Sequence, residues 1–144
     1  NGHGSWAEAM TVDRPINVPR RLLDEAVAHL RSVLPWEGCG LLAEARIGAD
    51  WSVCAFFPGD NVDRSRHRFT MDPRAVVDAL RTIDDRGWRL GAIVHSHPVG
   101  PATPSPTDIA EAYYPEAAML IVGLEGPAVD IRAWRLSGGE ADAE

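Results

Sequence analysis

The sequence predicts a single α/β domain in which a mixed central β-sheet is flanked by helices. Its 144 residues suit one domain with one sizeable core. Hydrophobic residues make up 45% of the chain and charged residues 24%, as in an ordinary globular protein. Segments with helical spacing of apolar residues are interspersed with short apolar runs typical of buried strands, which indicates an α/β fold.

The first half of the chain is expected to hold one helix and up to three strands. Apolar residues recur at helical spacing over residues 19–34, where Pro19 suits the first turn and Pro35 ends the helix. The apolar runs at 39–45 and 51–57 indicate strands, and Pro58-Gly59 closes the second. Residues 66–71 are a candidate for a short third strand.

The second half begins with a predicted helix that starts at Asp72-Pro73 and has Gly87 as its C-terminal cap. Its expected buried stripe consists of Val76, Val77, Leu80 and Ile83. Residues 90–95, 117–124 and 128–136 are further strand candidates, and residues 105–113 are predicted to form a short helix.

The two ends are predicted to lie outside the domain. Residues 1–15 are expected to be a disordered start or a cloning remnant, residues 16–136 the folded domain, and residues 137–144 a flexible polar tail. Charged residues interrupt the first apolar stretch, at 16–34, so we expect neither a signal peptide nor a membrane span. Cys39 and Cys54 are too few for a disulfide scaffold, and we expect buried thiols in a cytoplasmic protein.

The charge of the chain disfavours some partners. A net charge of −7 disfavours nonspecific binding to nucleic acid or to an anionic membrane, because both require a cationic surface. The densest cationic run contains Arg64, Arg66 and Arg68, which would share one face of an extended strand. A solvated strand is the default interpretation, and a surface that binds the substrate is the functional one.

The segment from His95 to Asp108 contains a candidate metal site. His95 and His97 are two residues apart at the end of a predicted strand and therefore point to the same side. With Asp108 as a third ligand, such a set leaves one tetrahedral position open, which is typical of catalytic zinc. The alternatives are a solvated strand end for the histidines and a helix capping box for Ser105 and Asp108.

Three motifs together resemble the JAMM (MPN+) zinc metalloprotease family, in its compact prokaryotic type. They are Glu37-Gly-Cys-Gly-Leu-Leu, then His95-Ser-His97-Pro, then Ser105-Pro-Thr-Asp108, with seven residues between His97 and Ser105. The resemblance extends over residues 16–136 and implies the JAMM/MPN fold, which is cytidine-deaminase-like. It also implies one Zn²⁺ per chain, held by His95, His97 and Asp108. Glu37 would deprotonate water and pass the proton to the leaving amine, and Ser105 would stabilise the oxyanion.

This resemblance implies a peptidase or isopeptidase that cleaves after the C-terminal Gly-Gly tail of a ubiquitin-like or sulfur-carrier protein adduct. Val94 stands where the eukaryotic deubiquitinases usually carry an aromatic residue, and residues 38–94 leave little room for an inserted loop. We therefore do not expect specificity for ubiquitin chains. A zinc hydrolase of a small amide and a catalytically silent scaffold of the same fold are the alternatives, and the oligomeric state is open.

Overall fold

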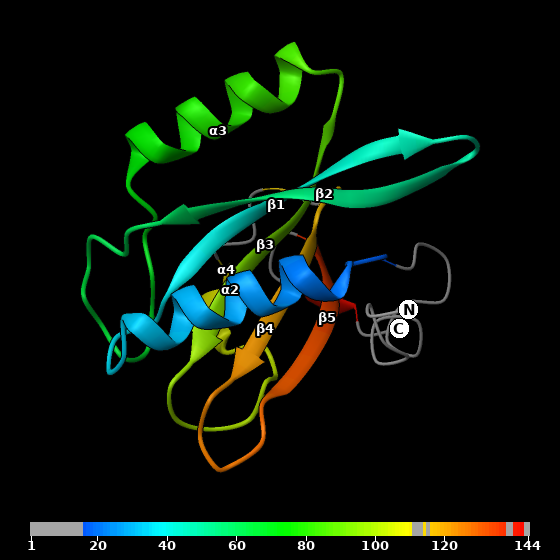
Figure 1. The fold of residues 1–144 in the computed structure, drawn as a ribbon. Helices are drawn as coiled ribbons and strands as arrows, with labels where there is room; N and C mark the ends of the chain where they lie inside the picture. Colours follow the sequence, from blue (N-terminus) through cyan, green and yellow to red (C-terminus); the bar gives the residue numbers. More distant parts are fainter. Residues whose placement is uncertain (1–15, 111–113, 115, 138–139, 143–144) are drawn as a thin grey trace.

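The chain folds into a mixed sheet with helices on both faces (Figure 1). The structure is a computed structural model that describes residues 16–110, 114, 116–137 and 140–142. In these residues the sheet has the strand order β2-β1-β3-β4-β5-β6, and β3 and β4 are its parallel pair. The elements are α2 (Arg20–Ser32), β1 (Cys39–Ile47), β2 (Asp50–Gly59), α3 (Pro73–Asp85), β3 (Arg89–His97), α4 (Pro106–Ala110), β4 (Ala118–Gly123), β5 (Asp130–Ser137) and β6 (Glu140–Asp142).

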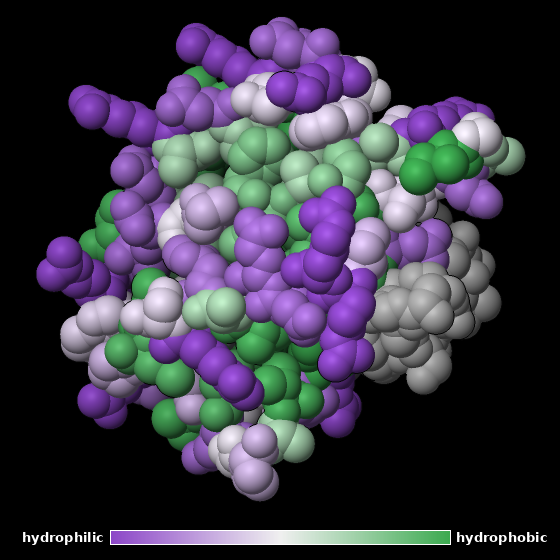
Figure 2. Space-filling view, viewed as in Figure 1, coloured by the Kyte–Doolittle hydropathy of each residue, from purple (hydrophilic) through white to green (hydrophobic). Residues whose placement is uncertain are grey.

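Alternation along the strands places α2 and α3 on opposite faces of the sheet. Leu42 of β1 and Val94 of β3 belong to the core cluster that contains the buried residues of α2, such as Leu30. Their neighbours Leu41 and Ile93 belong to the cluster under α3. On the side seen in Figure 2, hydrophilic residues dominate the outer surface, and apolar residues gather next to these helices. Burial of each large apolar side chain contributes about 1.5–3 kcal/mol, so both helices are fixed against the sheet that carries the histidines.

The predicted stripe of α3 is wrong at one position. Val77 is 47% exposed, whereas Ala79 and Ile83 are buried. Val76 also packs against the core, together with Ala79. Val76, Ala79 and Ile83 follow the helical spacing of three and four residues, and Val77 lies about 100° around the helix from Val76.

Residues 61–71 form a loop rather than the predicted strand, and we call them loop 61–71. An isolated bridge joins Asn61 to Met71, and the amide of Val62 donates to the carbonyl of Thr70 at 2.9 Å. Its three arginines, which we call the loop arginines, are exposed and share no strand face; Arg64 has a φ of 46°. The backbone of this segment binds the Asn61 side chain instead of a neighbouring strand, which explains the difference.

The ends of the chain differ in part from expectation. Residues 140–142 form β6, which pairs with β5, where we expected a flexible tail. Residues 1–15, 111–113, 115, 138–139 and 143–144 lie outside the described residues. The expected disordered start falls entirely in this part of the chain, and so does the end of the predicted helix at 105–113. None of the described helices combines the length and apolar character needed to cross a membrane. Cys39 is buried, Cys54 is half-buried, and neither is in a disulfide.

Candidate metal centre

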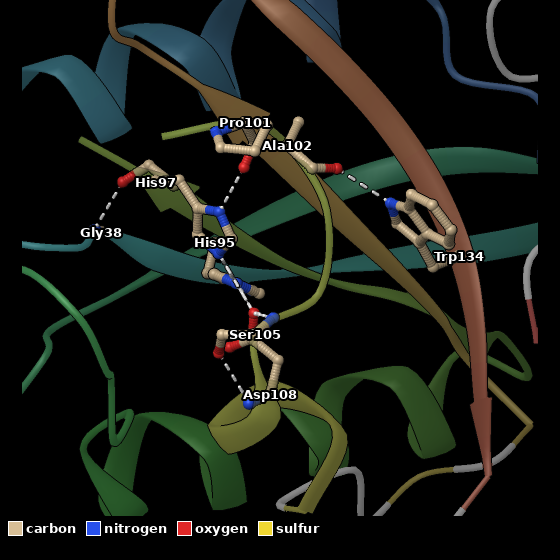
Figure 3. Close-up of polar contacts among 9 residues, drawn as sticks. Gly38, His95, His97, Pro101, Ala102, Ser105, Asp108 and Trp134 are labelled. Atoms are coloured by element: carbon tan, nitrogen blue, oxygen red, sulfur yellow. Dashed lines mark hydrogen bonds and ion pairs between the residues drawn. The ribbon is translucent and has the colours of Figure 1, made fainter. Parts of the chain in front are cut away.

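Three predicted ligands meet where β3 ends (Figure 3). His95 and His97 are the last two same-facing residues of β3, and Asp108 comes from the first turn of α4. The Nε2 atoms of the two histidines are 3.2 Å apart. The Oδ2 atom of Asp108 lies 3.2 Å from the Nε2 of His95 and 3.1 Å from that of His97. The three atoms therefore form a nearly equilateral triangle.

This triangle fits a metal ion. Atoms bonded at about 2.0–2.1 Å to a tetrahedral zinc lie about 3.3–3.4 Å from one another, close to the separations of these three atoms. The side chains are buried, with exposed fractions of 0% for His95, 8% for His97 and 4% for Asp108. Burying such polar groups is costly unless they are paired or bind a metal. The three residues form a group that could hold a metal ion.

A hydrogen bond at its other nitrogen fixes the orientation of the His97 ring. Its Nδ1 lies 2.8 Å from the carbonyl oxygen of Pro101. Because a carbonyl only accepts hydrogen bonds, Nδ1 carries the proton and the lone pair of Nε2 faces the site. The loop that carries Pro101 is held in turn, since the indole of Trp134 donates to the carbonyl of Ala102 at 3.0 Å (Figure 3). On the other histidine, the ring of Phe69 stacks on His95 at 4.7 Å between centroids.

Ser105 and Asp108 form the predicted capping box, and it coexists with the ligand geometry. The amide of Asp108 donates to the Oγ of Ser105 at 3.0 Å, and the amide of Ser105 donates to the Oδ2 of Asp108 at 2.9 Å. Burial acts to raise the pKa of Asp108, but hydrogen bonds with His95 and His97 hold that pKa well below its usual range. The carboxylate is therefore ionised and already aimed at both histidines.

Glu37 is buried beside this group. Its exposed fraction is 2%, and its Oε1 has no hydrogen-bond partner among the described residues. Burial raises the pKa of Glu37 to about 8, while His97 opposes and Asp108 reinforces the rise. The next residue ties the segment to β3, because the amide of Gly38 donates to the Oγ of Ser96 at 2.8 Å.

Loop 61–71 supplies contacts that the motifs do not include. The amide of Glu37 donates to the carbonyl of Ser65 at 2.7 Å, and the side chain of Asn61 donates to the carbonyl of Glu37 at 3.0 Å. Neither Asn61 nor Phe69 belongs to the three motifs that carry the resemblance. The loop arginines are exposed, and no described contact links them to the ligand group.

An apolar cavity of about 300 Å³ borders the ligand group under α3. Leu41, Ile93 and Met119 of the sheet and Leu80 of α3 line it, and Asp108 lies at its edge. The site thus combines a polar cluster that suits a cation with a neighbouring space that suits an apolar side chain.

Comparisons with known proteins agree with this geometry. Residues 19–137 match the family described as prokaryotic homologs of the JAB domain. A "Probable TtuB-protein conjugate cleaving protease" of Thermus thermophilus is 41% identical over 85% of this chain and 77% of its own length. A "CysO-cysteine peptidase" of Mycobacterium tuberculosis is 31% identical over 85% of this chain and 84% of its own length.

Solved structures show the same fold. A protein of Desulfitobacterium hafniense, solved in solution, has a TM-score of 0.78 and 35% identity, covering 90% of this chain and 89% of its own. A protein of Salinibacter ruber has a TM-score of 0.65 and 29% identity, covering 90% and 88%. The fold, the ligand group and these matches support one conclusion. The chain belongs to the family of prokaryotic homologs of the JAB domain.

Proposed function

We propose that this protein is a zinc-dependent peptidase that hydrolyses the amide bond after the C-terminal Gly-Gly tail of a ubiquitin-like or sulfur-carrier protein adduct. The observation that carries the proposal is the convergence of His95, His97 and Asp108 beside the buried carboxyl of Glu37. Family membership supports it, as do the names of two relatives, one a protease that cleaves a protein conjugate and the other a peptidase named for CysO-cysteine.

Zinc is the proposed metal because of the donor set. Two imidazoles and one carboxylate make a common set for catalytic zinc, and they leave a position for water or substrate. The two histidines and Asp108 would hold one ion per chain. When bound, zinc supplies Lewis acidity, which polarises the scissile carbonyl and lowers the pKa of water.

Glu37 and Ser105 are the proposed catalytic residues. Glu37 takes a proton from the attacking water and gives it to the amine as the C–N bond breaks. Its raised pKa of about 8 suits a group that both accepts and returns a proton near neutral pH. The hydroxyl of Ser105 accepts the amide hydrogen of Asp108 in the cap, so its own hydrogen can be donated to the oxyanion that develops on the carbonyl.

The surroundings of the site suit an extended protein tail. Glycine without a side chain lets the tail backbone approach the buried ligand group closely. The apolar cavity under α3 offers a place for an apolar side chain further along the same tail, because Leu41 and Ile93 line it next to Asp108. A small amide would leave this cavity unused.

The test combines metal analysis with a panel of substrates. Purified protein should contain about one zinc per chain and should lose activity on chelation and regain it with zinc. A ubiquitin-like protein ending in Gly-Gly, linked to cysteine or to a lysine side chain, should be cleaved faster than small amides. Faster cleavage of small amides would favour the small-amide hydrolase, and zinc binding without any hydrolysis would favour a silent scaffold.

A further inference from the structure

The side chain of Asn61 uses its whole hydrogen-bonding capacity to fold loop 61–71. Its Nδ2 donates to the carbonyls of Glu37, at 3.0 Å, and Arg68, at 3.1 Å. Its Oδ1 accepts from the amides of Asp63, at 3.1 Å, and Thr70, at 3.0 Å. An asparagine amide has two donor hydrogens and two lone pairs, so all four bonds are made. One half-buried side chain thus joins both arms of the loop to Glu37.

The loop that Asn61 holds touches both parts of the proposed reaction centre. The carbonyl of Ser65 accepts the amide of Glu37 at 2.7 Å. Four residues further on, the ring of Phe69 stacks on His95, with 4.7 Å between centroids and 25° between planes. A change in the path of the loop would therefore move Glu37 relative to the metal ligands.

Glu37 needs such support because its carboxyl is weakly held. The Oε1 atom is buried and has no hydrogen-bond partner among the described residues. Its position therefore depends on packing and on the backbone of Glu37, and the two bonds from loop 61–71 fix both the amide and the carbonyl of this residue. Displacement of a reacting group by about 1 Å can cost about 100-fold in rate.

We infer that Asn61 is a positioning residue for hydrolysis, one that holds loop 61–71 against the backbone of Glu37 and so sets where the Glu37 carboxyl lies relative to His95, His97 and Asp108. This inference rests on the proposed function, since it assigns Asn61 a role in the same reaction. In the described structure Asn61 makes no hydrogen bond to any of the three ligands, and other segments hold His97 and Asp108, so the Asn61 variants should keep their zinc.

Two variants of Asn61 remove different subsets of its four hydrogen bonds. Asn61→Asp keeps an oxygen for the amides of Asp63 and Thr70 but loses the donors to Glu37 and Arg68, whereas Asn61→Ala loses all four bonds. Asn17→Ala is the matched control. Asn17 also donates to a backbone carbonyl, that of Trp51 at 3.2 Å, and Trp51 lies at the end of β2 far from Cys39 and the site.

Kinetics, zinc content and hydrogen exchange are measured on the zinc-loaded full chain with a Gly-Gly adduct as substrate. Both Asn61 variants should lower kcat about 10- to 100-fold, leave KM within about twofold, and keep one zinc per chain. The amide of Glu37 should exchange faster in both. Asn17→Ala should keep wild-type kcat and wild-type exchange at Glu37. If Asn61→Ala does not fold, Asn61→Asp still tests the donor bonds.

A double-variant comparison decides between positioning and general stability. In a Glu37→Ala background, Asn61→Asp should lower the residual rate by less than about threefold, because it acts through Glu37. An equal loss in both backgrounds, or an unchanged kcat in Asn61→Asp, would overturn the inference while the proposed function stands. A wild-type protein that cleaves no adduct would instead refute the proposed function, and the inference with it.

Discussion

Replacement of Asp108 should expose two separable roles of one oxygen atom. The Oδ2 of Asp108 is within 3.2 Å of the Nε2 atoms of both histidines, and it accepts the amide of Ser105 at 2.9 Å. Asp108→Ala therefore removes a proposed metal ligand and half of the capping box. Ser105→Ala removes the other half of the box and no ligand, so the pair of variants distinguishes capping from metal binding.

The expected stability changes differ in size and in metal dependence. Loss of a capping interaction costs about 1 kcal/mol, and this cost should appear in both variants with or without zinc. Zinc at 100 times its dissociation constant stabilises the folded state by about 2.7 kcal/mol, and Asp108→Ala should forfeit this as well. In a domain of this size, 1 kcal/mol shifts Tm by roughly 3–4 °C. With zinc present, we expect a fall of roughly 12 °C for Asp108→Ala and roughly 3 °C for Ser105→Ala.

The assay is thermal unfolding with and without EDTA, together with elemental analysis of zinc per chain. Wild type and Ser105→Ala should both hold about one zinc and lose stability on chelation, as expected from an intact three-ligand site. Asp108→Ala should hold little zinc and respond little to EDTA. Full zinc content and a wild-type response to EDTA in Asp108→Ala would show that Asp108 is only a helix cap.

Three further predictions test other parts of the molecule. Glu37→Ala should keep its zinc and its fold but lose at least about 100-fold in kcat, and a loss within tenfold would remove it from the mechanism. Iodoacetamide should label half-buried Cys54 in the native protein and Cys39 only after unfolding, because burial hides the Cys39 thiol and raises its pKa to about 12. Labelling is measured by mass spectrometry, and equal labelling of both cysteines in the native protein would contradict this prediction. Replacing the loop arginines by alanine should raise KM for an acidic protein adduct and leave KM for a Gly-Gly peptide unchanged, and the rise should be smaller at high salt. An equal change in KM for both substrates would exclude docking through this loop.

The ligand group could be predicted because local rules determine most of it. Strand alternation makes His95 and His97 point to one side, and the capping box fixes where Asp108 points after the chain turns back. The mixed α/β sheet was predicted from the same kind of pattern and is confirmed. Residue spacing could not predict how close Asp108 comes to the two histidines. That distance depends on the packing of residues 98–105 and on the hydrogen bond that the indole of Trp134 donates to this segment.

Loop 61–71 could not be predicted, because its structure depends on one side chain bound to distant backbone groups. Alternating arginines at 64, 66 and 68 suit an extended strand equally well. The bonds of Asn61 to Glu37 and Thr70 instead bend the segment into a loop. The burial of Glu37 could not be predicted for the same reason, since the loop that binds the backbone of this residue is not visible in a single sequence.

Two different sets of hydrogen bonds hold the proposed ligands and Glu37, so the two can be perturbed separately. The cap at Ser105 fixes Asp108, and the carbonyl of Pro101 fixes His97, through hydrogen bonds that need no metal. These side chains are therefore already ordered in the folded protein before a metal binds. Loop 61–71 fixes Glu37 through a separate set of bonds that begins at Asn61. Metal affinity should therefore respond to changes around α4, and turnover at constant metal content should respond to changes in the loop. A perturbation of the loop that removed zinc and activity together would mean that the two sets of hydrogen bonds act as one.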